Sequence, residues 1–126
     1  IFRELNFNFA KKTIILLKGQ LGSGKTTFVK ELLSYKYKFN NVNSPTFGII
    51  NTYDVKENLI FHYDLYRINN VSELDEIGFY DNLETEAVHF IEWPEIIPLK
   101  MIYANYIISF EIIDQYRLIS IDDTDA

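Results

Sequence analysis

Apolar runs alternate along the chain with polar and glycine-rich segments, a pattern typical of an α/β protein. The run from Thr13 to Lys18 is β-branched and nearly continuous, which predicts a strand buried on both faces, as in a parallel sheet. From Lys25 to about Tyr35, apolar residues recur at helical spacing. The recurring residues are Phe28, Val29, Leu32 and Leu33. The chain is therefore expected to begin with a strand, a glycine-rich loop and a helix.

Two later regions predict antiparallel pairs of strands. The runs from Phe47 to Tyr53 and from Leu59 to Leu65 flank a short polar segment, which indicates a hairpin. The runs from Tyr106 to Ile113 and from Tyr116 to Ile121 predict a second, closing hairpin. We therefore expect a mixed parallel and antiparallel central sheet.

Shorter elements are predicted between the hairpins. The segment from Val71 to Ile77 opens with a serine that is followed three positions later by an acidic residue, which predicts a short helix with a side-chain cap. The segment from Tyr80 to Glu84 extends or repeats this helix. Ala87 to Ile91 is a further apolar strand, and its end delivers Glu92 and Trp93.

Length and composition fit one globular domain. The chain has 126 residues, of which 48% are hydrophobic and 24% charged, so intrinsic disorder is excluded as the main state. It has no cysteine, which excludes disulfides, thiol nucleophiles and iron–sulfur clusters. A chain without cysteine favours a reducing compartment, and we expect a cytoplasmic protein.

The charge balance argues against several partners. The net charge of −6 opposes autonomous binding to DNA or RNA, because such binding depends on clustered Lys and Arg. Apolar runs such as Thr13 to Leu17 are much shorter than the roughly 18 residues of a membrane helix, so no membrane partner is expected. If nucleic acid is involved, a partner protein must hold it.

The segment after the first strand fits the Walker A pattern G-x-x-x-x-G-K-[ST] at every defined position. It reads Gly19-Gln20-Leu21-Gly22-Ser23-Gly24-Lys25-Thr26. Glycines allow successive backbone amides to turn toward phosphate oxygens, and the start of a helix adds its positive end. A glycine-rich turn with a surface lysine is the alternative, but the complete pattern in this context argues against it. We expect a nucleoside triphosphate site.

Two side chains of this segment suit particular parts of the ligand. Lys25 can reach the β- and γ-phosphates, and the hydroxyl of Thr26 is a hard oxygen ligand for Mg²⁺. No N-K-x-D motif follows, so the usual guanine-specifying carboxylate is missing. ATP is the expected nucleotide.

The magnesium ion needs further oxygen ligands, which P-loop proteins supply from a nearby strand tip. Asp64 follows the run Leu59 to Tyr63, and Glu92 ends the run Val88 to Ile91. Spacing does not determine which of the two carboxylates binds the metal ion. One can bind metal while the other orients water.

Other residues admit both a functional and a structural interpretation. Thr46 is either a switch-like hydroxyl that senses the γ-phosphate or the first residue of a strand after a proline turn. Trp93 can line the nucleotide site or a partner surface, but a tryptophan more often belongs to the core. His62 and His89 lie inside apolar strands without a third ligand, which indicates structural roles.

Four segments together resemble the TsaE (YjeE) family of P-loop ATPases, which act in threonylcarbamoyladenosine modification of tRNA. In order along the chain they are Gly19-Gln20-Leu21-Gly22-Ser23-Gly24-Lys25-Thr26-Thr27, Ser44-Pro45-Thr46-Phe47, His62-Tyr63-Asp64-Leu65-Tyr66-Arg67 and Ile91-Glu92-Trp93-Pro94-Glu95. The first is shared by many P-loop proteins, whereas the D-L-Y-R and E-W-P elements are specific to this family. The resemblance covers nearly the whole chain.

The resemblance implies a three-layer P-loop NTPase-like α/β fold, with residues 1–126 as one ATPase domain whose N-terminal helix is incomplete. It implies an ATPase that works with the proteins TsaB and TsaD, which hold the tRNA. Thr26 and Glu92 would bind Mg²⁺, Asp64 would be needed for hydrolysis, and Arg117 would contact the nucleotide. The phosphates would be bound by Lys25 and by the loop residues Gly19, Leu21, Gly22, Ser23, Gly24 and Thr27.

Two other functions share the Walker A loop. A small-molecule kinase would need an acceptor pocket and an arginine-bearing lid, and few basic residues follow Lys25 to build one. A nucleotide-sensing adaptor would bind ATP without hydrolysing it. For an ATPase, Arg67 is the one internal candidate for an arginine finger, so slow turnover without partners is expected.

Overall fold

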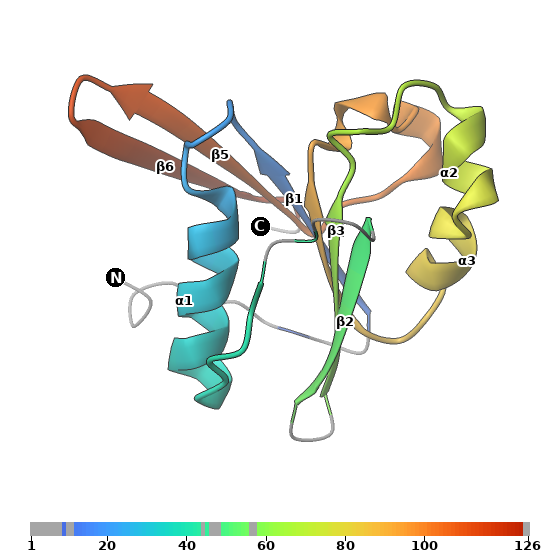
Figure 1. The fold of residues 1–126 in the computed structure, drawn as a ribbon, viewed down its shortest axis with the longest axis horizontal. Helices are drawn as coiled ribbons and strands as arrows, with labels where there is room; N and C mark the ends of the chain where they lie inside the picture. Colours follow the sequence, from blue (N-terminus) through green and yellow to red (C-terminus); the bar gives the residue numbers. More distant parts are fainter. Residues whose placement is uncertain (1–8, 10–11, 44, 46–48, 56–57, 125–126) are drawn as a thin grey trace.

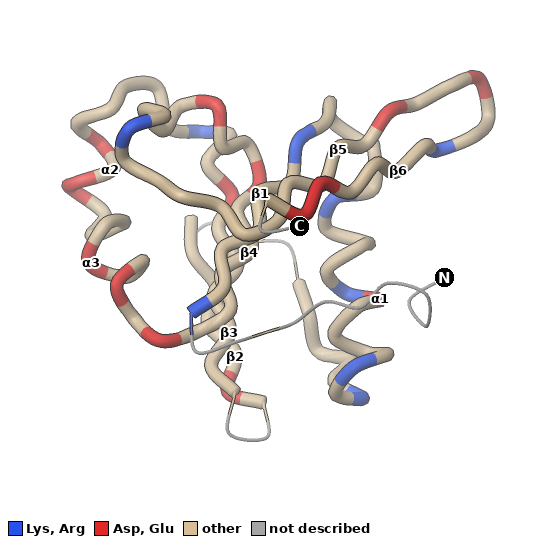
Figure 2. The backbone as a smooth tube through the Cα atoms, turned by 180° about the vertical axis from the view of Figure 1, so that it is seen from behind, with Lys and Arg blue, Asp and Glu red and all other residues tan. Residues whose placement is uncertain are grey.

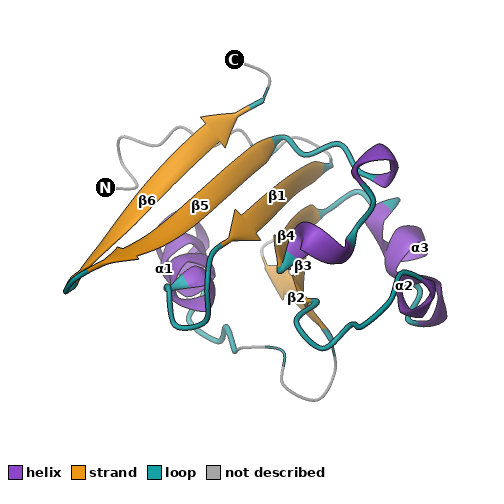
Figure 3. Cartoon of the chain, turned by 90° about the horizontal axis from the view of Figure 1, so that it is seen from above, coloured by secondary structure: helices purple, strands orange, loops and turns teal. Residues whose placement is uncertain are grey.

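The fold is built around one mixed sheet, shown in a computed structural model that describes residue 9 and residues 12–43, 45, 49–55 and 58–124. The described strands form a six-stranded sheet in the order β2-β3-β4-β1-β5-β6 (Figures 1 and 3). Their bounds are β1 Thr13–Lys18, β2 Ile50–Val55, β3 Asn58–Asp64, β4 Val88–Glu92, β5 Tyr106–Ile113 and β6 Tyr116–Asp123. Strands β3, β4, β1 and β5 are parallel, whereas β2 and β6 pair antiparallel at the two edges.

Helices cover both faces of this sheet, which gives three layers. Helix α1 (Lys25–Tyr37) lies on one side, and α2 (Ser72–Glu76) and α3 (Phe79–Leu83) lie on the other (Figure 1). Two short 3₁₀ helices, η1 (Pro94–Ile96) and η2 (Leu99–Met101), follow β4. The structure therefore has the mixed-sheet, three-layer α/β architecture expected from the sequence.

The alternation of side chains along the central strands divides the core in two. On β1, Ile15 and Leu17 pack with the apolar face of α1, while Ile14 and Leu16 pack on the side of α2 and α3. A strand buried on both faces reads as a continuous apolar run, because neither set of alternating side chains faces water. This explains the continuous apolar run from which the sequence predicted β1.

Most predicted elements are confirmed, with changes at their ends. Both hairpins are present, and α3 is a separate helix after α2. Helix α1 continues to Tyr37, two residues beyond its predicted end. The predicted side-chain cap of the first short helix is wrong: Ser72 is already helical, its hydroxyl donates to Asn70 Oδ1, and the residue before it makes no side-chain cap.

A buried polar pair lies in the core beside α3. The hydroxyl of Tyr63 is 2.7 Å from His89 Nδ1, and the other ring nitrogen, Nε2, is 2.9 Å from the carbonyl oxygen of Thr85. A carbonyl only accepts, so Nε2 carries the proton and Nδ1 accepts from the tyrosine. Burial lowers the pKa of His89, and its ring stacks on Phe61. His89 is thus a core residue, as its place in an apolar strand indicated.

Within the part of the chain that the structure describes, no helix combines the length and apolar character needed to cross a membrane.

We predict that Tyr63→Phe lowers the free energy of unfolding by about 1–3 kcal/mol, because it leaves the buried Nδ1 of His89 without a donor. Urea unfolding at pH 7 measures this loss. Tyr116→Phe removes the same hydroxyl from a side chain that is 75% exposed, and we expect a change within about 0.5 kcal/mol. Equal losses in the two variants would contradict the assigned role of the Tyr63 hydroxyl.

Candidate functional site

The loop between β1 and α1 is shaped by its glycines. Gly22 and Gly24 have φ angles of +75° and +104°, which side chains with a Cβ rarely adopt. At Gly19 the limit is space, since a Cβ would lie 2.7 Å from Ser23 Oγ and 2.9 Å from the Cβ of Phe110. The loop therefore curls tightly between the end of β1 and the start of α1.

The ends of two neighbouring strands face this loop. Glu92, the last residue of β4, pairs in register with Leu17 of β1 and with Asp64, the last residue of β3. The C-terminal ends of parallel strands lie at the same end of a sheet, and β1 runs into the loop at that end. The topology thus brings together the loop and both of the carboxylates that the sequence singled out.

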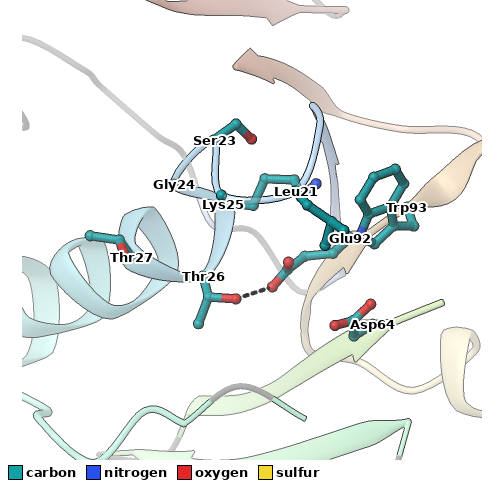
Figure 4. A pocket seen from close by; sticks show the side chains of 10 residues that line it. Leu21, Ser23, Gly24, Lys25, Thr26, Thr27, Asp64, Glu92 and Trp93 are labelled. Atoms are coloured by element: carbon teal, nitrogen blue, oxygen red, sulfur yellow. Dashed lines mark hydrogen bonds between the residues drawn. The ribbon is translucent and has the colours of Figure 1, made fainter. Parts of the chain in front are cut away.

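A chain of hydrogen bonds joins α1 to the two strands. The Thr26 hydroxyl donates to Glu92 Oε2 at 2.7 Å (Figure 4). The same carboxylate oxygen lies 2.5 Å from Nε2 of His62, which is fully buried in β3. Glu92 itself is only 4% exposed. Its charge is therefore held by two donors at the edge of the cavity.

The side chain of Lys25 lies among carbonyl oxygens, an aromatic ring and carboxylates. Its ammonium donates to the carbonyl oxygens of Gly19 and Gln20, and it lies 3.7 Å from the centre of the Trp93 ring. Burial lowers the pKa of Lys25, while the carboxylates of Glu92, Asp64 and Glu95 act in the opposite direction. The ammonium is thus directed into the region between the loop and the tip of β4.

Asp64 lies in a less polar setting than a surface carboxylate. One of its oxygens, Oδ1, accepts a hydrogen bond of 3.1 Å from the backbone N–H of Tyr66. Burial raises the pKa of Asp64, and the nearby charge of Glu92 adds to this, whereas the Tyr66 bond, His62 and Lys25 lower it. Asp64 therefore holds a proton more readily than a free aspartate does.

These groups line a cavity of about 260 Å³. The lining residues are Leu21, Gly22, Ser23, Gly24, Lys25, Thr26, Thr27, Asp64, Glu92 and Trp93 (Figure 4). Ser23 contributes a buried hydroxyl that has no hydrogen-bond partner among the described residues. The predicted loop residues from Leu21 to Thr27 and both carboxylates thus border one space, whereas Gly19 does not line it.

Two other predicted residues, Arg117 and Arg67, lie away from the cavity. Arg117 is exposed on β6, opposite Ile112 of β5, and does not line the cavity. Arg67 is exposed after β3 and does not line it either. Thr46 lies outside the described residues.

Two residues have a closer relation to the site than the sequence indicated. Trp93 is half buried and packs against the core on the α2–α3 side, yet it also lines the cavity beside Lys25. His62, interpreted from sequence as structural, contacts Glu92. The strand period indicates only that His62 and Asp64, two residues apart, share one face of β3, and the contact with Glu92 depends in addition on the pairing of β3 with β4.

The oxygen donors at the cavity suit one kind of metal ion better than others. A hydroxyl and two carboxylates are hard ligands of the type that Mg²⁺ prefers. Among the described residues, no group of three or more His, Cys, Asp and Glu side chains is arranged to hold a metal ion by itself. A site that shares its ion with phosphates and water does not require such a group.

Comparisons with known proteins agree with this architecture. A family model described as "Threonylcarbamoyl adenosine biosynthesis protein TsaE" matches residues 1–122. Proteins described as "tRNA threonylcarbamoyladenosine biosynthesis protein TsaE" are similar. The one from Rickettsia felis is 39% identical over 82% of this chain and 61% of its own length. The one from Haemophilus influenzae is 34% identical over 80% of this chain and 66% of its own.

The fold has a counterpart among solved structures. The crystal structure of Bacillus subtilis YdiB matches with a TM-score of 0.58 and 25% sequence identity, over 86% of this chain and 66% of that one. The chain spans between about half and two thirds of the length of the first three curated relatives. The family model nonetheless covers almost all of this chain. The described strands and helices form the P-loop NTPase-like fold with a mixed sheet that the sequence predicted. The chain belongs to the TsaE family.

Proposed function

We propose that residues 1–126 form one nucleotide-binding domain that binds ATP with Mg²⁺ and hydrolyses it, in support of threonylcarbamoyladenosine modification of tRNA together with TsaB and TsaD. The observation that carries this proposal is the meeting of the Thr26 hydroxyl, Glu92 and Asp64 beside a complete Walker A loop. Family membership supports the pathway, because relatives carry that function in their descriptions.

Phosphate binding is assigned to the loop. A strand, a glycine loop with left-handed residues and a helix that begins at Lys25 form the arrangement that binds anions through backbone amides and the helix N-terminus. Lys25 adds a cation inside the same cavity. A triphosphate carries the negative charge that this set of donors would stabilise.

Metal binding is assigned to Thr26 and Glu92. Because the Thr26 hydroxyl donates its hydrogen bond to Glu92, the lone pairs of its oxygen remain for a cation. When bound, Mg²⁺ supplies neutralisation of the charge on the β- and γ-phosphate oxygens. Asp64 lies next to Glu92 in the sheet and can contribute a further oxygen.

Hydrolysis requires a group that orients water and accepts its proton. Asp64 is the candidate, since it borders the cavity and the hydrogen bond given for its side chain goes to the backbone N–H of Tyr66 and not to Thr26. Positioning and charge stabilisation account for most of the rate in phosphoryl transfer. Arg67 lies outside the cavity, so we propose that partner proteins complete the site and that turnover without them is slow.

The charge distribution supports a partner that holds the tRNA. Acidic residues gather around α2 and α3, whereas lysines are spread along α1 (Figure 2). With a net charge of −6, the chain lacks the excess of basic residues on which autonomous RNA binding depends. The proposed role therefore requires docking on protein and no direct grip on RNA.

Lys25→Met is expected to weaken ATP binding at least tenfold, because it removes a charge-assisted bond to phosphate worth about 1.5–3 kcal/mol while keeping an apolar stem of similar length. Titration calorimetry measures the binding. Lys30→Met, an exposed change on the same helix, should leave affinity within twofold. Wild-type affinity in a folded Lys25→Met protein would refute the assignment of the loop.

The proposed pathway is tested by reconstitution. TsaB and TsaD from the same organism are mixed with tRNA and the substrates of the modification, and threonylcarbamoyladenosine is measured with the wild-type chain or with Lys25→Met. Formation should depend on the chain and on Lys25. Phosphorylation of a small-molecule acceptor in place of ATP hydrolysis would instead favour a kinase. If a non-hydrolysable ATP analogue supported full modification, the adaptor interpretation would be favoured.

Glu92→Gln should raise the Mg²⁺ concentration needed for half-maximal ATP hydrolysis about tenfold, because it removes a negative charge and conserves shape. ATP binding without Mg²⁺ should change little. Asp64→Asn should reduce the maximal rate with a smaller effect on Mg²⁺ dependence. The two responses exchanged would mean that the roles of the carboxylates are reversed.

A further inference from the structure

We propose that His62 is a positioning residue that holds the Glu92 carboxylate in the orientation in which it binds Mg²⁺. This inference rests on the proposed function, in which Glu92 is a metal ligand. It adds a role for a residue that does not border the cavity and therefore does not touch the nucleotide.

The first support is the geometry at Glu92. His62 Nε2 and Thr26 Oγ1 lie 2.5 Å and 2.7 Å from the same oxygen, Oε2. A carboxylate accepts from both, so Nε2 carries a proton. Among the bonds that the described residues make, none goes to the other oxygen, Oε1, which leaves that oxygen for a ligand in the cavity.

The second support is the position of His62 in the sheet. His62 pairs with Phe90 and Asp64 pairs with Glu92, so His62 is a diagonal neighbour of Glu92 on the face that packs toward α1. The backbone register fixes this separation, and the His62 side chain is fully buried, so its ring has little freedom. A donor on a rigid strand defines direction better than one on a loop.

The third support is the other nitrogen of the ring. Nδ1 is buried and has no hydrogen-bond partner among the described residues. Leaving a buried polar atom unsatisfied is unfavourable, a cost that an apolar side chain at this position would avoid. The contact with Glu92 is thus the polar interaction that the structure gives the ring, and it offsets this cost.

The expected effect follows from what the bond restrains. A glutamate at a strand end has three side-chain torsions, and ordering such a side chain costs conformational entropy. Two donors on Oε2 meet this cost before metal binds. Removing a partner that orients a metal ligand typically lowers metal affinity or activity by about 10–100-fold.

The test compares variants that keep or remove the donor. His62→Gln places an amide N–H near the position of Nε2, whereas His62→Leu has no donor and His62→Asn is too short to reach. The matched control is His89→Gln, which alters a buried histidine that stacks on Phe61 on the opposite face of the sheet. Calorimetry measures nucleotide binding with and without Mg²⁺, and ¹H–¹⁵N NMR of the wild-type protein identifies which nitrogen of His62 carries the proton.

We expect His62→Leu and His62→Asn to weaken Mg²⁺-dependent binding about 10–100-fold, with Mg²⁺-free binding within twofold of wild type. His62→Gln should recover most of the loss, and His89→Gln should leave the Mg²⁺ dependence unchanged. The NMR spectrum should show a proton on Nε2 of His62.

Two results would overturn the inference alone: wild-type Mg²⁺ dependence in a folded His62→Leu or His62→Asn variant, or a proton on Nδ1 in place of Nε2. If His62→Leu does not fold, the comparison of His62→Gln with His62→Asn and the NMR assignment still decide. A wild-type chain that binds no nucleotide would overturn the proposed function and, with it, this inference. The wild-type measurement therefore separates the two failures.

Discussion

The parallel pairing of β3, β4 and β1 is the constraint on which the site depends. It aligns the C-terminal ends of the three strands at one end of the sheet, where β1 leads into the glycine loop. Thr26 and Glu92 are 66 residues apart in the sequence, yet their side chains meet because Glu92 is in register with Leu17, at the end of β1. Without that pairing the loop would face no carboxylate.

The register of these strands is in turn fixed by packing on both faces. Ile91 points into the core beside α2 and α3, and Phe90 into the core beside α1. A slip of one residue would exchange the faces and would direct Glu92 into the apolar core beside α2 and α3, away from Thr26 and His62. The two cores therefore determine which way the carboxylate points, so the site is a consequence of the hydrophobic pattern.

Most of this architecture was predictable because it depends on local signals. The continuous apolar run of β1, the Walker A spacing and the strand tips at Asp64 and Glu92 are all legible in the sequence. The bond between His62 and Glu92 was not, because it depends on the relative register of β3 and β4, which the period within a strand does not define. The cap at Ser72 was mispredicted since Ser72 bonds to the side chain of Asn70 and is itself part of the helix.

The residue after Glu92 shows how the chain leaves the strand without disturbing the site. Trp93 adopts a left-handed conformation, with φ 59° and ψ 55°, and Pro94 begins η1 immediately after it. For a residue with a bulky side chain this backbone costs about 1–3 kcal/mol.

Contacts of the Trp93 ring are of the same order as that cost. The ring faces the ammonium of Lys25 at 3.7 Å and packs against Tyr66 with 4.9 Å between ring centres. Such contacts contribute about 0.5–2 kcal/mol and about 0.5–1.5 kcal/mol respectively. The strained turn is therefore offset by contacts to the start of α1 and to the segment after β3. Since α1 carries Thr26, and Tyr66 follows Asp64 by two residues, the turn at Trp93 stabilises the convergence of loop and strand tips that the parallel sheet establishes.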